Sequence, residues 1–150
     1  MKLILRVLLL AITTLAAPGP TAAQQADGTV IYLVRHAETA PDGTPDPALS
    51  GEGRARAARL AAMLGAAGLE AVHTTPYRRT RGTADAVASA AGLQPREYDP
   101  RALEAFAAQL VGEGGTHLVV GHSNTTPALV RARLYRYRFT TPAERRQTVR

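Results

Sequence analysis

The sequence predicts an α/β fold with three layers, in which helices cover both faces of a mainly parallel β-sheet. Two features of the chain predict this class. Short apolar runs rich in β-branched residues alternate with longer segments whose apolar residues recur at helical spacing, and glycine or proline residues separate most of them. The 150-residue chain contains no cysteine, so disulfide bonds and a thiolate nucleophile are both excluded.

The start of the chain has the pattern of an export signal over residues 1–23. Two basic residues precede an apolar run from Val7 to Ala17, and small residues follow it. We expect cleavage after Ala23 and a single mature domain of residues 24–150, in the periplasm or secreted. The alternative is a retained membrane anchor, although the apolar run is shorter than the roughly 20 residues that span a bilayer.

Basic residues exceed acidic ones: the net charge is +6, and it is +4 without Lys2 and Arg6. This balance favours an anionic substrate. Much of the excess positive charge lies in the tail. It contains one acidic residue, Glu144, and seven arginines: Arg131, Arg133, Arg136, Arg138, Arg145, Arg146 and Arg150. Aromatic residues are few and no nucleic-acid motif is present, so we expect a solvated edge there rather than a nucleic-acid-binding surface.

The mature domain is expected to begin with a strand and a helix. Thr29 to Val34 has the apolar, β-branched composition of a strand buried on both faces. Beyond a loop from Pro41 to Pro47, Ser50 can cap a helix that stops at Gly68. The apolar residues of this helix follow helical spacing at Ala57, Leu60, Ala61 and Leu64.

A second strand and helix follow directly. Leu69 to Thr74 is a short strand, and Pro76 begins a helix that Gly92 ends. One face of that helix carries Ala84, Val87, Ala88 and Ala91. Gln94 to Tyr98 is a weaker strand.

The next predicted helix starts at Asp99, which can act as its N-cap ahead of Pro100, and its apolar face consists of Leu103, Phe106, Ala107 and Leu110. Thr116 to Val120 is the following strand. A short helix then begins around Thr126, and a final strand is predicted from the alternation of arginines with Tyr135, Tyr137 and Phe139.

Ligands of parallel sheets bind beyond the carboxyl ends of the strands. Three segments are expected at that rim: Arg35-His36, the turn from Thr74 to Arg79, and Gly121-His122. A neutral imidazole can attack phosphorus, and the planar fork of an arginine binds phosphate oxygens in pairs. The helix after His122 can also present backbone N–H groups to an anion.

With these motifs in this order, the sequence resembles the histidine phosphatase superfamily, also called phosphoglycerate mutase-like, and especially its small exported bacterial members. The resemblance runs from about Thr29 to Val130. It rests on three motifs: Arg35-His36-Ala37-Glu38, Thr75-Pro76-Tyr77-Arg78-Arg79-Thr80-Arg81-Gly82-Thr83-Ala84, and Gly121-His122-Ser123.

The resemblance implies a phosphate-monoester hydrolase in which His36 is transiently phosphorylated. Arg35, Arg79 and His122 would hold the phosphoryl group, and His122 would also take part in catalysis. No metal or cofactor is implied. The expected partner is a small phosphorylated molecule or a phosphoprotein, with no nucleic acid and no membrane contact after signal cleavage.

The chain departs from larger relatives at two places. Ser123 follows His122 where some relatives carry the acid that protonates the leaving group, which leaves Asp99 and Glu104 as candidate acids. The relatives usually have a longer loop before the last strand, whereas only Arg131 to Arg133 separate Val130 from Leu134, so the domain has a shortened C-terminal part. A catalytically inactive phosphate-binding or scaffold protein of the same fold is therefore the alternative.

Two other enzyme classes can be drawn from the same residues. Gly121 to Thr125 resembles the turn around the nucleophile of a serine hydrolase, but every histidine precedes Ser123, the reverse of the order in that fold. A metal-dependent hydrolase could instead use His36, Glu38, His73 and His122 as ligands.

Overall fold

The computed structural model describes residues 28–137, with side chains through Ala132. Strands and helices alternate along this part of the chain. The elements are β1 (Val30–Arg35), α1 (Gly51–Leu64), β2 (Ala71–Thr74), α2 (Arg78–Ala91), β3 (Arg96–Glu97), α3 (Leu103–Glu113), β4 (Thr116–Gly121) and α4 (Thr125–Tyr137).

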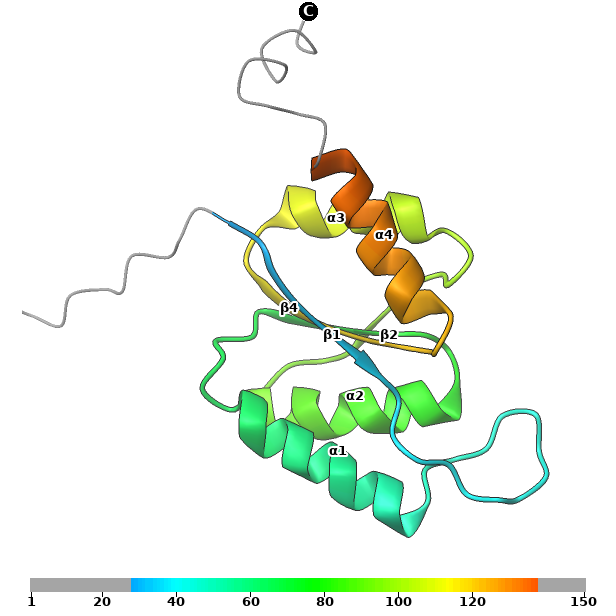
Figure 1. Cartoon of the computed structure of the whole chain (residues 1–150). Helices are drawn as coiled ribbons and strands as arrows, with labels where there is room; N and C mark the ends of the chain where they lie inside the picture. The colour runs from blue at the N-terminus through cyan, green and yellow to red at the C-terminus, as the bar shows by residue number, and fades with distance from the viewer. Residues whose placement is uncertain (1–27, 138–150) are drawn as a thin grey trace, which may run out of the picture.

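The four strands form one parallel sheet in the order β1-β4-β2-β3. Helices α1 and α2 lie on one face of the sheet, and α3 and α4 lie on the other (Figure 1). This arrangement confirms the predicted three-layer α/β class. Because all strands run the same way, their carboxyl ends share one rim, which positions the residues that follow them.

Alternate residues of the central strand β4 contribute to the two layers of the core. Leu118 and Val120 pack with Ala84 and Val87 on the side of α1 and α2. Val119 packs instead with Phe106, Leu110 and Leu129 on the side of α3 and α4. The period of two expected of a strand therefore distributes one apolar run between both layers.

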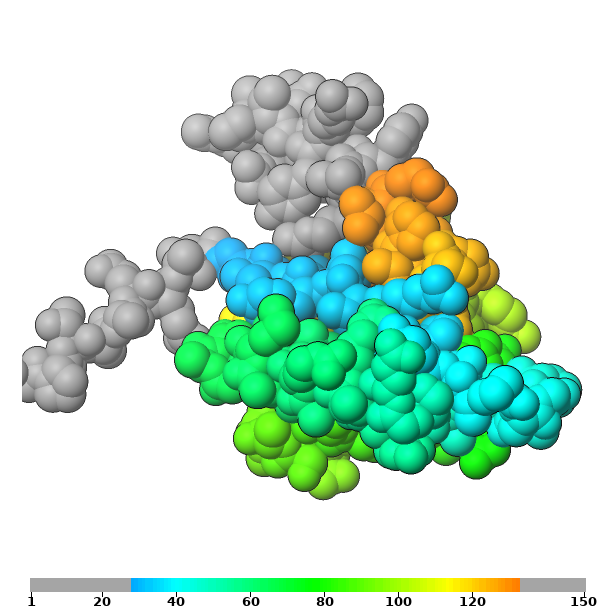
Figure 2. All heavy atoms as spheres, turned by 60° about the horizontal axis from the view of Figure 1, so that its bottom comes forward, coloured from blue at the N-terminus to red at the C-terminus, as the bar shows by residue number. Residues whose placement is uncertain are grey.

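The prediction that the first strand is buried on both faces was wrong. Among the described residues β1 pairs with β4 alone and forms one edge of the sheet. Val30 is 46% exposed and Tyr32 is 37% exposed. Figure 2 shows β1, in blue, at the surface beside α1, in green. Composition alone does not distinguish an edge strand from a central one, because an apolar strand needs only one well-covered face.

The helix boundaries follow their local capping signals with small shifts. The side chain of Ser50 accepts a hydrogen bond from the backbone N–H of Gly53, so it caps α1 as predicted. That helix ends at Leu64 with Gly65 as its C-cap, earlier than the predicted stop at Gly68. Helix α2 begins at Arg78 rather than Pro76 and ends, as predicted, at Gly92 in a left-handed conformation.

Asp99 is not the N-cap of α3, contrary to the prediction. A turn comes first, in which the N–H of Ala102 donates to the carbonyl of Asp99 over 3.1 Å. The N-cap is Ala102, which makes no capping bond through its side chain. The carboxylate of Asp99 accepts instead from the backbone and side chain of Arg101.

The predicted final strand was wrong at Tyr135 and Tyr137, which belong to helix α4. Phe139 lies outside the described residues. No glycine or proline interrupts the chain from Ala128 to Tyr137, so the helix that begins at Thr125 has no local reason to stop. Alternating aromatic residues and arginines are therefore compatible with a helix whose buried face includes Leu129.

None of the helices within residues 28–137 combines the length and the apolar character that crossing a membrane requires. The predicted export signal of residues 1–23 lies outside the described part of the chain.

Candidate active site

The ends of three parallel strands meet at one rim of the sheet. Arg35, at the end of β1, lies opposite Gly121, at the end of β4. The N–H of His36 continues this pairing by donating to the carbonyl of Gly121 over 3.0 Å. Thr75, directly after β2, reaches the ring of His122. The structure thus brings together the three segments that the sequence placed at this rim.

The ring of His36 is held in one protonation pattern by the backbone of the next residue, Ala37. Its Nδ1 lies 2.8 Å from the carbonyl oxygen of Ala37, which can only accept a hydrogen bond, so Nδ1 carries the proton. The Nε2 lone pair is then free. The amide of Ala37 in turn donates to the hydroxyl of Thr83 over 3.0 Å, which ties this turn to α2.

The ring of His122 lies 5.5 Å from that of His36, centroid to centroid, with an angle of 67° between their planes. The hydroxyl of Thr75 is 2.9 Å from His122 Nε2, and the hydroxyl of Thr80 is 2.7 Å from that of Thr75. The hydroxyl of Thr80 also lies 3.0 Å and 2.9 Å from the carbonyl oxygens of Thr75 and Tyr77, which can only accept. When Thr80 donates to a carbonyl, Thr75 donates to Thr80 and accepts from Nε2 of His122. When Thr80 donates to Thr75 instead, Thr75 donates to Nε2, and Nδ1 of His122 carries the proton.

Arg79 is the arginine of the second motif that lies beside both histidines. It is partly buried, whereas Arg78 and Arg81 are exposed. Its guanidinium lies 4.6 Å from the centre of the Tyr77 ring and 3.3 Å from the Asp46 carboxylate. The Arg81 side chain points elsewhere, since it pairs with Glu97.

The electrostatics of the rim favour neutral imidazoles and bound anions. Burial lowers the pKa of His122 to about 4, and the cationic Arg79 adds to this effect. Burial also lowers the pKa of His36, and Arg35 and Arg79 lower it further. Both rings are therefore neutral near pH 7, and the positive charge of the rim comes from the arginines.

Three contacting residues were not anticipated from the sequence as parts of the site: Thr75, Tyr77 and Asp46. The Tyr77 ring lies edge-on to His122, with centroids 5.0 Å apart. Asp46 accepts from the backbone N–H of Arg78 as well as from the Arg79 side chain. Thr75 and Tyr77 belong to a recognised motif, but Asp46 lies in a loop far along the chain, where spacing carries no signal.

The contacts of the two candidate proton donors, Asp99 and Glu104, do not connect either carboxyl group to the rim. Asp99 is engaged by Arg101, and this hydrogen bonding lowers the pKa of its carboxyl. Glu104 is exposed in the first turn of α3, as the helix dipole favours. Asp46 is the carboxylate that contacts a residue of the rim directly.

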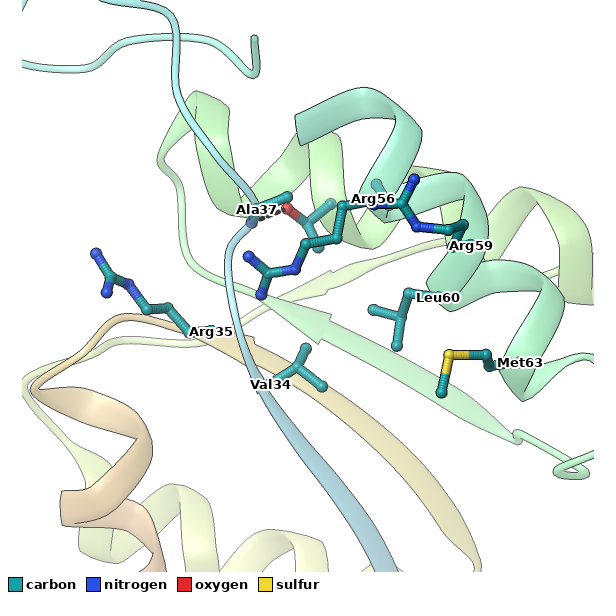
Figure 3. Close-up of a pocket in the computed structure, with 9 residues that line it drawn as sticks. Val34, Arg35, Ala37, Arg56, Arg59, Leu60 and Met63 are labelled. Atoms are coloured by element: carbon teal, nitrogen blue, oxygen red, sulfur yellow. Dashed lines mark hydrogen bonds between the residues drawn. The ribbon is translucent and has the colours of Figure 1, made fainter. Parts of the chain in front are cut away.

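A pocket lies next to the rim, between β1 and α1. Figure 3 shows Leu60 and Met63 of α1 beside Val34 of β1, and the pocket is also lined by Arg35, Arg56 and Arg59. Apolar side chains dominate this lining. The pocket therefore offers apolar contact beside the site, together with the guanidinium groups of Arg59 and of Arg56, which pairs with Glu38.

The ligand set of a metal-dependent hydrolase does not assemble at the rim as proposed from the sequence. His73 faces the opposite layer, where its neighbours are His117 and Phe106. Glu38 pairs with Arg56. The serine hydrolase alternative gains no support either, because the His122 ring contacts Thr75, His36 and Tyr77, and Ser123 is exposed.

Comparison with known proteins places this geometry in a family. The family model of the histidine phosphatase superfamily (branch 1) matches residues 31–113 of this chain. A search of curated proteins found no match.

Among solved structures, the protein histidine phosphatase SixA in complex with tungstate is similar over 67% of this chain and 74% of its own, with 22% identity and a TM-score of 0.59. A structure from Agrobacterium tumefaciens that carries the name phosphohistidine phosphatase SixA shares 25% identity over 71% of this chain and 77% of its own, with a TM-score of 0.58. A mycobacterial glucosyl-3-phosphoglycerate phosphatase shares the fold at 18% identity, covering 67% of this chain and 76% of its own, with a TM-score of 0.58.

These structures are those of phosphatases, and they have the parallel sheet and helical layers found here. The family match covers more than half of the chain and includes the first two of the three motifs around which the rim is built. The chain therefore belongs to branch 1 of the histidine phosphatase superfamily.

Proposed function

We propose that this protein hydrolyses phosphate monoesters through a phosphohistidine intermediate on His36. The observation that carries the proposal is the pairing of His36 with His122, rings 5.5 Å apart, beside the guanidinium of Arg79. Family membership supports a phosphatase. The hydrogen bond from Nδ1 of His36 to Ala37 supports Nε2 as the attacking atom, because it leaves that nitrogen unprotonated.

The reaction would take place in two steps. Nε2 of His36 forms a bond to phosphorus while the bond between phosphorus and the ester oxygen breaks, and the departing alcohol takes up a proton. Water then attacks phosphorus, the N–P bond breaks, and phosphate leaves with His36 neutral again. In the transition state of each step, negative charge is spread over the phosphoryl oxygens. Hydrogen-bond donors fixed around these oxygens therefore lower the activation barrier.

The surrounding side chains would provide those donors. The forks of Arg35 and Arg79 can each bind two phosphoryl oxygens. His122 can donate a further hydrogen bond through Nδ1 in the arrangement in which Thr75 donates to its Nε2. The first turn of α4 begins at Thr125, directly beyond His122, and adds the positive end of a helix dipole. We propose that these groups replace a metal ion in the reaction.

The test is to trap the intermediate. The purified protein is exposed briefly to a labelled aryl phosphate in the presence of a chelator, quenched, and digested for mass spectrometry. We expect an acid-labile, base-stable phosphate on the peptide that contains His36, and none in a folded His36→Gln variant. An acid-stable label on Ser123 would contradict the proposal.

The same measurement addresses the alternative of an inactive phosphate-binding or scaffold protein. The observation that favours this alternative is that Asp99 is bound by Arg101 and Glu104 is exposed, so neither candidate acid is held at the rim. Such a protein would bind tungstate or phosphate at the rim, but it would neither acquire label on His36 nor release phosphate from any ester in a broad substrate screen.

A further inference from the structure

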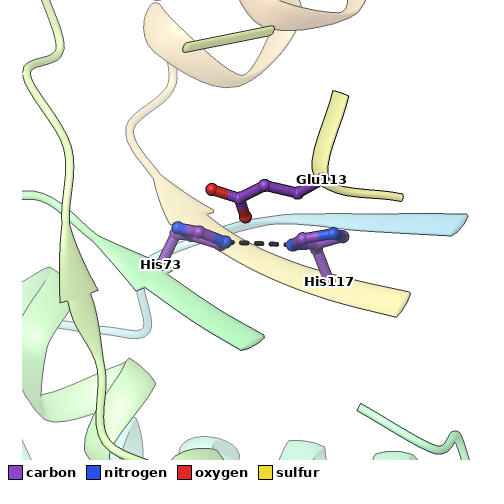
Figure 4. Close-up of side chains that lie close together, drawn as sticks. All are labelled: His73, Glu113 and His117. Atoms are coloured by element: carbon purple, nitrogen blue, oxygen red, sulfur yellow. Dashed lines mark hydrogen bonds between the residues drawn. The ribbon is translucent and has the colours of Figure 1, made fainter. Parts of the chain in front are cut away.

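A second pair of histidines lies outside the candidate active site, between the sheet and α3. His73 is on β2 and His117 is near the amino end of the adjacent strand β4, and both are 2% exposed. Glu113, the last residue of α3, lies beside them (Figure 4). The chain has four histidines, so this pair accounts for every imidazole that the rim does not use.

The two rings present ring nitrogens to each other. Nε2 of His73 and Nδ1 of His117 are 3.1 Å apart, and a carboxylate oxygen of Glu113 lies within 4.8 Å of a ring nitrogen of each histidine. Two lone pairs at this distance repel unless something positive lies between them. The pair therefore shares either a proton or a metal ion.

The spacing suits a metal ion with tetrahedral geometry. If each nitrogen were about 2.05 Å from a zinc ion, the 3.1 Å separation would correspond to an N–Zn–N angle of about 98°, roughly ten degrees below the tetrahedral value. A relaxation of a few tenths of an ångström closes that difference between the two nitrogens. The carboxylate oxygen, which lies within 4.8 Å of a ring nitrogen of each histidine, would reach binding distance by rotation of the exposed Glu113 side chain. Two imidazoles and one carboxylate are a frequent protein donor set for zinc, which leaves one position for water.

A neighbouring carbonyl fixes the protonation pattern of His117. Its Nε2 makes a short contact with the carbonyl oxygen of Gly114, which can only accept a hydrogen bond. The ring proton is therefore on Nε2, and Nδ1 keeps a lone pair that can bind a metal ion. Histidines that bind metals commonly have this arrangement, with the second ring N–H given to a backbone carbonyl.

Two side chains, those of Gln109 and Arg96, position the carboxylate of Glu113. Gln109, one helical turn earlier, donates to Oε1 over 2.7 Å, and the guanidinium of Arg96 lies 3.7 Å from Oε2. Figure 4 shows the carboxylate on one side of the line that joins the two rings. Because Glu113 is exposed, an ion can enter from solvent. The negative charge of Glu113 also offsets the positive charge of the nearby Arg96.

We propose that His73, His117 and Glu113 bind one zinc ion, through Nε2, Nδ1 and a carboxylate oxygen respectively. The ion would connect β2, β4 and the end of α3 on the face of the sheet that α3 covers. Its role would be to stabilise the fold, because the ligands point away from the rim where the reaction is proposed. The site is thus independent of the proposed phosphatase chemistry.

The test uses the full chain, freed of metal with a chelator and desalted, and titrated with Zn²⁺ by calorimetry. We expect one equivalent to bind and the melting temperature to rise by at least about 5 °C at saturation. Co²⁺ should give the visible absorption of a four-coordinate site. The absence of saturable binding at one equivalent would overturn the proposal, leaving a histidine pair that shares a proton.

Variants locate the ion without relying on the buried residues alone. Glu113→Gln removes an exposed ligand and should weaken zinc binding at least about ten-fold, whereas Glu52→Gln, an equally exposed change in α1, should leave it unaltered. His73→Gln should abolish tight binding. His36→Gln should retain it; if His36→Gln abolishes binding while Glu113→Gln does not, the ion is at the rim and the assignment is wrong.

Discussion

Three functional side chains of the rim, those of His36, His122 and Arg79, each contact a neighbour that influences their protonation or their direction. The carbonyl of Ala37 sets the tautomer of His36, and the hydroxyl of Thr75 engages the ring of His122. Asp46 and Tyr77 hold the guanidinium of Arg79 at the same rim. Such supporting contacts matter for catalysis, because a displacement of about 1 Å at the reacting groups can cost a hundred-fold in rate.

Substituting the arginines one at a time should separate Arg79 from its neighbours. Removing a charge-assisted contact to the phosphoryl group costs roughly 1.5 to 3 kcal/mol. At about 1.4 kcal/mol per ten-fold, Arg79→Ala should lower kcat/KM by at least about ten-fold to a hundred-fold. The matched controls Arg78→Ala and Arg81→Ala should change it little, since both side chains are exposed. A greater loss in folded Arg81→Ala than in Arg79→Ala would show that the phosphate site is elsewhere.

The dependence of activity on pH should report the protonation of His36. Burial and the nearby Arg35 and Arg79 lower the pKa of its ring, so the neutral, attacking form persists below the ordinary value of 6.5. We expect the acid limb of kcat/KM to have its midpoint below pH 6.5 and to shift to higher pH in Arg79→Gln, which removes one of the cations. Using one substrate for both proteins cancels the ionisation of the substrate itself. An unchanged midpoint in the variant would show that this limb does not report His36.

At the scale of elements, α1 packs against the turn that follows the proposed nucleophile, His36. Gly53 in its first turn comes so close to the turn after His36 that an added Cβ would lie 2.0 Å from the carbonyl oxygen of Glu38. The N–H of Ser50 donates to that same carbonyl over 2.9 Å. The backbone of α1 therefore packs directly against the active-site turn, and only glycine permits this approach.

A pair of glycine substitutions in α1 tests this contact. Gly53→Ala forces the backbone of Glu38 to move and should lower the free energy of unfolding by about 1 to 3 kcal/mol. The control Gly51→Ala meets only the end of the Arg54 side chain at 3.9 Å, so its effect should lie within about 0.5 kcal/mol or be slightly stabilising. Urea unfolding measures both. Equal stabilities of the two variants would mean that α1 can shift away from the turn without cost.

At the scale of the whole molecule, one parallel sheet separates two kinds of histidine site. His36 and His122 lie at the carboxyl ends of the strands, where backbone groups and helix ends converge on a ligand. His73 and His117 lie between the sheet and α3, in contact with the apolar core. We propose that the same fold binds an anion at the first site and a cation at the second.

The expected export of the chain is also a property of the whole molecule. We propose that the basic and apolar start of the sequence directs the protein to the periplasm and is removed. Sequencing the N-terminus of protein recovered from the periplasmic fraction should give a start at or near Gln24. Recovery of the form that begins with Met1 from the cytosol would contradict both the localisation and the mature domain boundary.

The sequence by itself was sufficient for the order of the elements up to the helix after His122, for the parallel sheet, and for the positions of Arg35, His36, Arg79 and His122 relative to strand ends. These depend on local signals. Apolar period, caps such as Ser50 and stops such as Gly92 act over a few residues and can be identified one at a time.

What only the tertiary structure decided depends on distant parts of the chain. The position of β1 at a sheet edge follows from which strand pairs with β4, and the pairing of Asp46 with Arg79 follows from how one loop folds over a helix. The grouping of His73 with His117 and Glu113, instead of with His36, follows from the face of the sheet on which each residue lies. No local pattern encodes these contacts, because they form only when the strands pair and the helices pack on them.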